Sequence, residues 1–148
     1  MTNELPEIKC AIIGTGDLES EVKEVADRLH LRVNLDFLGY LNNPMKVLHS
    51  SSVLLMTSVS EGTPMSALEA MTLGVPIVST PTDGLCEVVI DGSTGFLSND
   101  NHLLASRIIG ILNDKVLYEE LSQNSINRAK TIMDLNNYHE ILKASYKS

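Results

Sequence analysis

Residues 53–80 read VLLMTSVSEGTPMSALEAMTLGVPIVST and contain a complete strand, helix and strand pattern. Residues 53–56 are continuously apolar, as expected for a strand that is covered on both faces. A polar loop at 57–63 leads into a helix predicted from 64 to about 73, and residues 75–79 predict a second covered strand. Two strands joined by a helix usually pair in parallel through a right-handed crossover, so this stretch predicts an α/β fold.

The same alternation continues on both sides of this stretch. Upstream, the apolar periodicity predicts a buried strand at 8–13, a helix at 18–29, a strand at 33–38 and a short helix at 45–49. Downstream it predicts a helix at 85–90, a strand at 94–97, two helices along 103–112 and 117–132, and a final helix at 137–146. The alternation favours a doubly wound α/β domain, an open parallel sheet with helices on both faces.

Length and charge restrict the classes of protein. The 148 residues fit a single domain over 1–148 with a sizeable core. Lys and Arg number 11 against 19 Asp and Glu, giving a net charge of −8, which excludes nucleic-acid binding because that begins with a positive patch. No apolar run is long enough to cross a bilayer, and residues 1–8 are too polar for a signal peptide. We therefore expect a soluble, cytoplasmic protein.

Cysteine and histidine usage indicates neither disulfides nor a metal site. Cys10 and Cys86 belong to no C-x-x-C pair, and we expect both to be buried thiols. The four histidines lie far apart and share no helix face with a pair of carboxylates. We therefore expect no metal ligands.

A glycine turn follows the first predicted strand. Gly14 and Gly16 stand between a strand and a helix, the setting of a dinucleotide-binding fingerprint, but Glu19 occupies the position of the third glycine. The turn can equally be a tight turn without a ligand. Because ligands of such sheets bind beyond the carboxyl ends of the strands, the loops after 13, 38, 56 and 79 are the places to inspect.

Two carboxylates mark the loop and helix after residue 56. Glu61 lies in the loop, and Glu69 falls on the second turn of the following helix. The pair could be ordinary solvated charges, or the acid and nucleophile of a glycoside hydrolase, although those residues normally come from separate elements across a cleft. Flanking a helix end, they also suit a ligand with hydroxyls on both sides of a diphosphate, which is a nucleotide sugar.

The residues between the two acids suit the approach of such a ligand. Gly62 lets a ligand come close to the backbone. We expect Thr63 to cap the helix and Pro64 to take its first position. The N–H groups of Met65 and Ser66 would then stay free at a helix end that favours an anion.

The run EGTPMSALEAMTLGVPIVST resembles the E-x7-E signature of retaining GT-B glycosyltransferases of group 1 (family 4), which typically reads EGxxxxxxEAMAxGxPVV. IIGTG, DFLGY, VLLMTS and DGSTGFL are similar to further family segments in order and spacing. The resemblance covers residues 8–112. It implies the Rossmann-like, donor-binding C-terminal half of such an enzyme, without its first strand.

The resemblance also implies roles for individual residues. As the first acid of the signature, Glu61 would contact hydroxyls of the transferred sugar, and Glu69 would hold the ribose hydroxyls of the nucleotide. The backbone of Gly62, Thr63, Pro64 and Met65 would line the sugar and diphosphate, and that of Gly39, Tyr40 and Leu41 would meet the base. Gly14 and Gly16 complete the donor-binding set, and Glu61 is the expected catalytic residue.

The family resemblance further implies a reaction and its partners. The parent enzyme would be a hexosyltransferase that moves a sugar with retention from a UDP- or GDP-sugar to an unidentified acceptor, without metal or cofactor, in polysaccharide biosynthesis. Peripheral membrane association would involve an acceptor domain that is absent here.

This sequence departs from the family pattern in several places. The family's Arg and Lys that bind the diphosphate have no counterpart, since Lys9 is the only basic residue among the first 22. Asp83 and Gly84 stand where many members have two glycines. The chain alone should therefore bind its donor weakly and transfer nothing.

Two other classes of function compete with this hypothesis. The chain could be a non-enzymatic nucleotide-binding or interaction domain on the same scaffold. It could also be an NAD-dependent oxidoreductase, although the missing third glycine opposes this.

Overall fold

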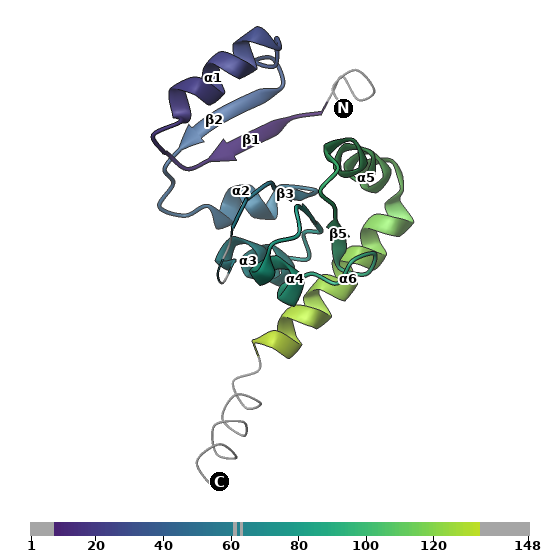
Figure 1. Cartoon of the computed structure of the whole chain (residues 1–148). Helices are drawn as coiled ribbons and strands as arrows, with labels where there is room; N and C mark the ends of the chain where they lie inside the picture. The colour runs from purple at the N-terminus through teal and green to yellow at the C-terminus, as the bar shows by residue number, and fades with distance from the viewer. Residues whose placement is uncertain (1–7, 61, 63, 134–148) are drawn as a thin grey trace, which may run out of the picture. The chain divides into compact units, whose positions relative to one another are not determined.

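The computed structural model of the chain describes residues 8–60, 62 and 64–133. The elements follow in the order β1 (Cys10–Ile13), α1 (Glu19–Arg28), β2 (Leu35–Gly39), α2 (Met45–His49), β3 (Leu54–Met56), α3 (Met65–Thr72), β4 (Ile77–Ser79), α4 (Asp83–Val88), β5 (Gly95–Leu97), α5 (Asn101–Asn113) and α6 (Lys115–Ile132) (Figure 1). The predicted alternation of strands and helices is thus confirmed, while the helix predicted at 137–146 lies outside the described residues. No helix in the described part is long and apolar enough to traverse a bilayer.

The chain divides into two compact units, and the boundary between Val47 and Leu48 falls inside α2. In the first unit β1 and β2 pair in parallel in a 2-stranded sheet, and in the second β3, β4 and β5 form a 3-stranded parallel sheet in that order. Within each unit the strands pair in parallel, as predicted for an open α/β sheet. The single-domain boundary at 1–148 stays a prediction.

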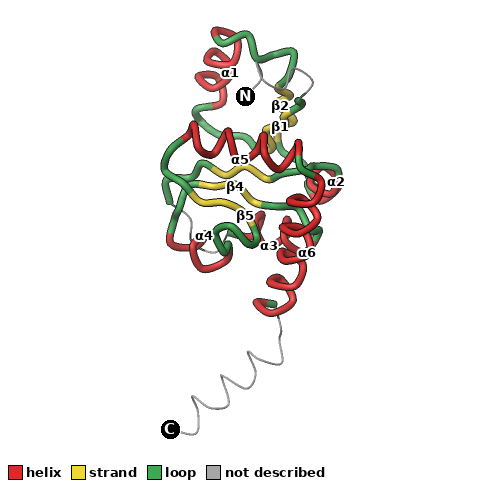
Figure 2. The backbone as a smooth tube through the Cα atoms, turned by 90° about the vertical axis from the view of Figure 1, so that its right-hand side faces the viewer, coloured by secondary structure: helices red, strands yellow, loops and turns green. Residues whose placement is uncertain are grey.

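The core of the second unit is built around β4. In Figure 2, α5 lies along one face of the 3-stranded sheet and α3 lies on the other. This covering explains why β4 is fully buried, as the sequence predicts. The side chains that fill the core include Ala67, Ala70 and Met71 from α3, Ile77 and Val78 from β4, Leu85 from α4, Ile111 from α5 and Leu121 from α6.

Two glycines in the second unit are fixed by close packing. Gly74 directly follows the C-cap of α3 and has φ +70°, and a Cβ there would lie 2.5 Å from Ser122 Oγ on α6. Gly95 opens β5 opposite Ile77, and a Cβ there would overlap the Ile77 carbonyl oxygen and lie 2.9 Å from the carbonyl carbon. Both positions admit only glycine, because the neighbouring elements leave no room for a side chain.

Two strands predicted to be buried are partly exposed. Ile12 and Ile13 of β1 are each 39% exposed, and Leu55 of β3 is 47% exposed. The physical reason is that the burial of a strand's side chains depends on what packs on its faces, and among the described residues β1 pairs only with β2 and β3 only with β4. An apolar run alone does not distinguish an edge strand from a central one.

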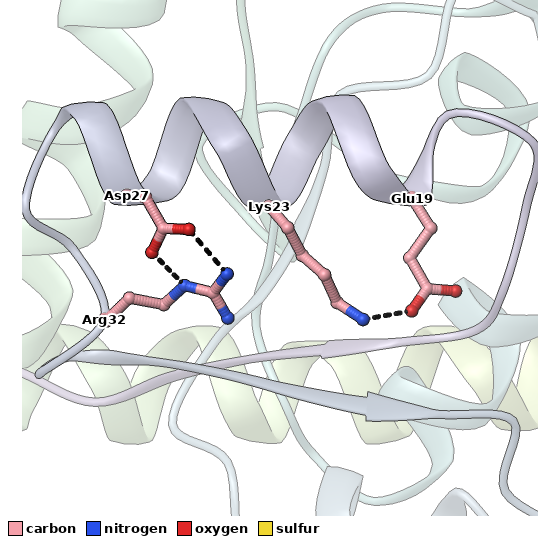
Figure 3. A network of polar contacts seen from close by, with 4 residues as sticks. All are labelled: Glu19, Lys23, Asp27 and Arg32. Carbon is pink, nitrogen blue, oxygen red and sulfur yellow. Dashed lines mark hydrogen bonds and ion pairs between the residues drawn. The ribbon is translucent and has the colours of Figure 1, made fainter.

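Polar contacts tie α1 of the first unit to the strand that follows it. Figure 3 shows Lys23 paired with Glu19 within α1, and Arg32 donating two hydrogen bonds to the Asp27 carboxylate, of which the longer measures 2.9 Å. The hydrogen bond from Arg32 holds the pKa of Asp27 below its ordinary value. The Arg32 guanidinium also lies 5.3 Å from the centroid of the Phe37 ring in β2.

The two cysteines differ in accessibility. Cys10 is half-buried in β1, and desolvation by burial raises the pKa of its thiol. Cys86 is exposed, so the expectation of a buried thiol there is wrong. Cys86 lies on α4 beside the fully buried Leu85, and adjacent residues of a helix point in different directions.

Candidate functional site

The segment that carries the two-acid motif follows directly on β3 in the second unit. β3 and β4 run side by side in parallel, and Met56 is the register partner of Ser79, so both strands end at the same edge of the sheet. Ligands of parallel sheets bind outside this edge. Gly62, Pro64 and α3 follow from it, whereas Glu61 and Thr63 lie outside the described residues.

The start of α3 presents free backbone donors. The helix begins at Met65, and Pro64 is its N-cap with ψ 83°. The prediction that Pro64 takes the first helical position is wrong by one residue, because this ψ is not helical. No side chain caps α3, and among the described residues the N–H groups of Met65 and Ser66 have no acceptor. The free N–H groups at this helix end can therefore donate hydrogen bonds to an anion.

Glu69 lies on the second turn of α3, as predicted, and is half-buried. Met65 stands four residues earlier on the same helix face and is 58% exposed, so this face opens to solvent. Within the described residues, no donor or cation contacts the Glu69 carboxylate. A carboxylate so placed can accept two hydrogen bonds from a diol.

Gly62 is exposed, and no atom lies within 4 Å of the position that a Cβ would occupy. Packing in the described part of the chain therefore does not require glycine here. Its predicted role, close approach of the backbone to a ligand, stays a prediction.

Hydroxyl groups around the ends of β3 and β4 form contacts that sequence reasoning missed. Thr80 Oγ1 donates to the Ser58 carbonyl oxygen at 2.7 Å, and the Thr80 N–H donates to the Met56 carbonyl at 3.0 Å. Ser66 Oγ on α3 lies 3.8 Å from Met56 Sδ. The position of Thr80 directly after a covered strand was the only sequence feature that pointed to it. Its hydrogen bond to a residue 22 positions earlier leaves no pattern in the local sequence.

The remaining predicted residues belong to the first unit. Gly14 N–H donates to the Gly39 carbonyl at 2.7 Å, which joins the carboxyl ends of β1 and β2. Both glycines have positive φ, +120° and +63°. Tyr40 is 75% exposed and Leu41 is half-buried. The structure thus brings Gly14 and Gly39 together, and their predicted contacts with a donor stay predictions.

An open pocket of about 270 Å³ adjoins the glycine turn of the first unit. Gly14, Thr15 and Gly16 line it together with apolar side chains of β1 and α1, among them Ile13 and Val22. Among the described residues no Lys or Arg lines this mainly apolar wall, and the nearby Lys23 is paired with Glu19. The lining of the pocket therefore does not decide between a nucleotide-binding site and a tight turn without a ligand.

Basic side chains are distributed differently around the two predicted clusters, since Lys23 pairs with Glu19 at the pocket beside the glycine turn. The sequence has no Lys or Arg between Lys46 and Arg107, a stretch that includes β3, α3, β4 and α4. In the first unit Lys9 donates to the Val33 carbonyl at 2.6 Å. Among residues 8–60, 62 and 64–133, no three His, Cys, Asp or Glu side chains form a group that could hold a metal ion.

Curated relatives are similar over much of the chain. It is 32% identical over 124 residues to the N-acetyl-alpha-D-glucosaminyl L-malate synthase of Bacillus anthracis, covering 82% of this chain and 32% of the relative. It is 34% identical over 91 residues to an uncharacterized glycosyltransferase of Methanocaldococcus jannaschii, covering 58% of this chain and 22% of the relative. The chain thus spans about a third or less of the length of these relatives.

Solved structures confirm the fold. Anabaena HepE in complex with UDP-glucose has a TM-score of 0.84 at 22% identity, over 96% of this chain and 41% of that one. The pneumococcal O-GlcNAc transferase GtfA in complex with UDP and GlcNAc has a TM-score of 0.83 at 22% identity, over 99% of this chain and 30% of that one. The architecture is the Rossmann-like α/β arrangement of GT-B glycosyltransferases. Residues 1–130 match the family Glycosyl transferases group 1, and the chain therefore belongs to the group 1 glycosyl transferases.

Proposed function

We propose that the chain is the donor-binding part of a retaining, family 4 hexosyltransferase that moves a sugar from a nucleotide sugar to an acceptor. Relatives whose names specify sugar transfer support this, such as the poly(glycerol-phosphate) alpha-glucosyltransferase of Bacillus subtilis. Solved GT-B structures that contain UDP and a sugar support a UDP-sugar as donor, with a GDP-sugar as the alternative. A role in polysaccharide biosynthesis agrees with the capsular polysaccharide glycosyltransferase CapM of Staphylococcus aureus.

One observation carries the proposal. At the carboxyl edge of the second sheet, the uncapped N–H groups of Met65 and Ser66 lie one turn before Glu69, whose carboxylate has no partner among the described residues. The donors suit the diphosphate of a nucleotide sugar, and the carboxylate suits its ribose hydroxyls. Free donors and a free acceptor thus stand on the first two turns of the same helix.

This arrangement suggests how the residues act on a donor. When the bond between the anomeric carbon and the diphosphate breaks, negative charge builds up on the leaving phosphate, and the N–H groups of Met65 and Ser66 stabilise it. Glu69 orients the nucleotide through its ribose hydroxyls. Glu61 accepts hydrogen bonds from hydroxyls of the transferred sugar. Retention follows if the leaving phosphate takes the proton of the acceptor hydroxyl on the face that it vacates.

The proposal includes weak donor binding by this chain alone. The stretch between Lys46 and Arg107 carries no Lys or Arg, so the backbone dipole of α3 is what this stretch itself offers to the charge of the diphosphate. We therefore expect no transfer by the chain itself. For the whole enzyme we propose a reaction in the cytoplasm without metal or cofactor, and membrane association through an acceptor domain.

Titration of the chain with UDP-glucose and GDP-mannose, followed by amide NMR, tests this proposal. We expect the largest shift changes at the amides of Met65 and Ser66. Glu69→Gln and Glu61→Ala should each weaken binding, by about three- to tenfold for one lost hydrogen bond. Glu120→Gln is the matched control, because Glu120 is exposed on α6.

Two results would contradict the assignment. The first is unchanged affinity in both Glu61→Ala and Glu69→Gln. The second is an equal loss of affinity in Glu120→Gln, which would indicate a general effect of charge rather than contact at the site.

A further inference from the structure

We propose that Thr80 is a positioning residue of the site, whose hydroxyl holds the backbone after β3 in the conformation that leads to Gly62 and α3. The inference rests on the function proposed above. It concerns a residue outside the two-acid motif, 22 positions after its bonding partner Ser58.

Two hydrogen bonds from one residue define the contact. The Thr80 N–H donates to the Met56 carbonyl at 3.0 Å and continues the pairing of β3 with β4 by one step. Thr80 Oγ1 then donates to the Ser58 carbonyl at 2.7 Å, where regular pairing has ended. The backbone bond alone would fix the end of the strand. The hydroxyl extends the connection into the loop.

The strand that precedes Thr80 is buried in the core. Thr80 follows Ser79, the fully buried last residue of the central strand β4. At the other end of the loop, Pro64 is buried and α3 is inserted into the core through Ala67 and Ala70. The described residues on either side of this loop, Met56 in β3 and the buried Pro64, are thus held in place, and the Thr80 hydroxyl adds a contact at Ser58.

A side-chain hydrogen bond at this point affects ligand binding by ordering the backbone of the loop, and the Thr80 side chain itself need not touch the ligand. Without it, segment 57–60 would exchange among more backbone conformations, and binding a donor would have to restore the productive one. Thr80→Val keeps the shape and removes only the donor, which leaves the Ser58 carbonyl without that bond. Thr80→Ser keeps the hydroxyl.

The experiment compares wild type, Thr80→Val, Thr80→Ser and the control Thr131→Val in the whole chain. Thr131 also makes a hydroxyl-to-carbonyl hydrogen bond, an exposed one of 3.1 Å to Asn127 within α6. Two quantities are measured: amide hydrogen exchange over residues 57–60, and the dissociation constant for UDP by NMR titration.

We expect Thr80→Val to exchange faster over 57–60 and to bind UDP about three- to tenfold more weakly, as for the loss of one hydrogen bond. Thr80→Ser should restore both values, and Thr131→Val should change neither. Unchanged exchange or unchanged affinity in Thr80→Val would overturn the inference, as would failure of serine to rescue. If wild type binds no UDP, the proposed function fails, whereas the exchange data still decide whether Thr80 holds the segment.

Discussion

Replacing Gly95 by alanine tests the packing of β5 against β4. Gly95 is the register partner of Ile77, and a Cβ at this position would overlap the Ile77 carbonyl oxygen and lie 2.9 Å from the carbonyl carbon. Ile77 belongs to the fully buried central strand, so its backbone cannot retreat into solvent. Relief therefore requires β5 to move away from β4 and weaken the pairing of the two strands.

The magnitude follows from the kind of clash. Overpacking a core costs about 1–3 kcal/mol, and the upper end applies because the obstacle is backbone rather than a flexible side chain. For a chain of this size, 1 kcal/mol changes Tm by about 2–4 °C, so we expect Gly95→Ala to lower Tm by about 6–12 °C.

Thermal unfolding followed by circular dichroism measures the effect, and Gly110→Ala is the matched control. Gly110 lies inside α5, and no atom outside its own helix lies within 4 Å of the position of a new Cβ. The same substitution should there stabilise the protein by about 0.5–1 kcal/mol. A Gly95→Ala protein that unfolds within about 1 °C of wild type would refute the reasoning.

Three further outcomes test other parts of the structure. Asp114 caps α6 by accepting from two backbone N–H groups at 2.9 and 3.0 Å, so Asp114→Ala should cost about 1 kcal/mol in urea unfolding, and an unchanged midpoint would contradict the cap. Iodoacetamide at neutral pH should label exposed Cys86 before half-buried Cys10, whose pKa burial raises, and mass spectrometry of early time points would show the reverse if this is wrong. The pKa of Asp27 is lowered by Arg32 from its ordinary value of 3.8, so this pair stabilises the fold above that pH and loses its effect as pH falls through the lowered pKa. Asp27→Asn should accordingly have a slightly lower Tm than wild type at neutral pH and the same Tm in strong acid. A Tm difference that persists in acid would exclude the ionised carboxylate as its source.

The order and type of the elements could be predicted because each depends on local periodicity. The short helix at Met45–His49 was predicted with its observed bounds, and α4 was predicted two residues too late because its first apolar side chain is Leu85, which follows Asp83 and Gly84. Burial was harder to predict. The runs that became β1 and β3 are as apolar as a central strand, but exposure depends on which neighbours cover them, and this is not a property of the run itself.

The site was predictable to the extent that its residues lie close in sequence. Glu69 and Met65 occupy adjacent turns of one helix, so their spacing fixed their common face. The N-cap was misassigned because Pro64 can occupy either position and the backbone angle that decides between them depends on the preceding loop. Thr80 could not be found, since its bond to Ser58 arises from the pairing of two strands.

The close fit of Gly74 against Ser122 has a consequence for the order in which the chain becomes structured during synthesis. α3 contributes its buried face to a core that α6 completes, and α6 ends at Ile132, 60 residues after α3 ends at Thr72 (132 − 72). Contacts this distant in sequence form only when the later partner is available. We therefore expect the helix that carries Glu69 to gain stable structure only after Ile132 has left the ribosome, and nascent chains arrested before and after α6 should differ in their resistance to protease.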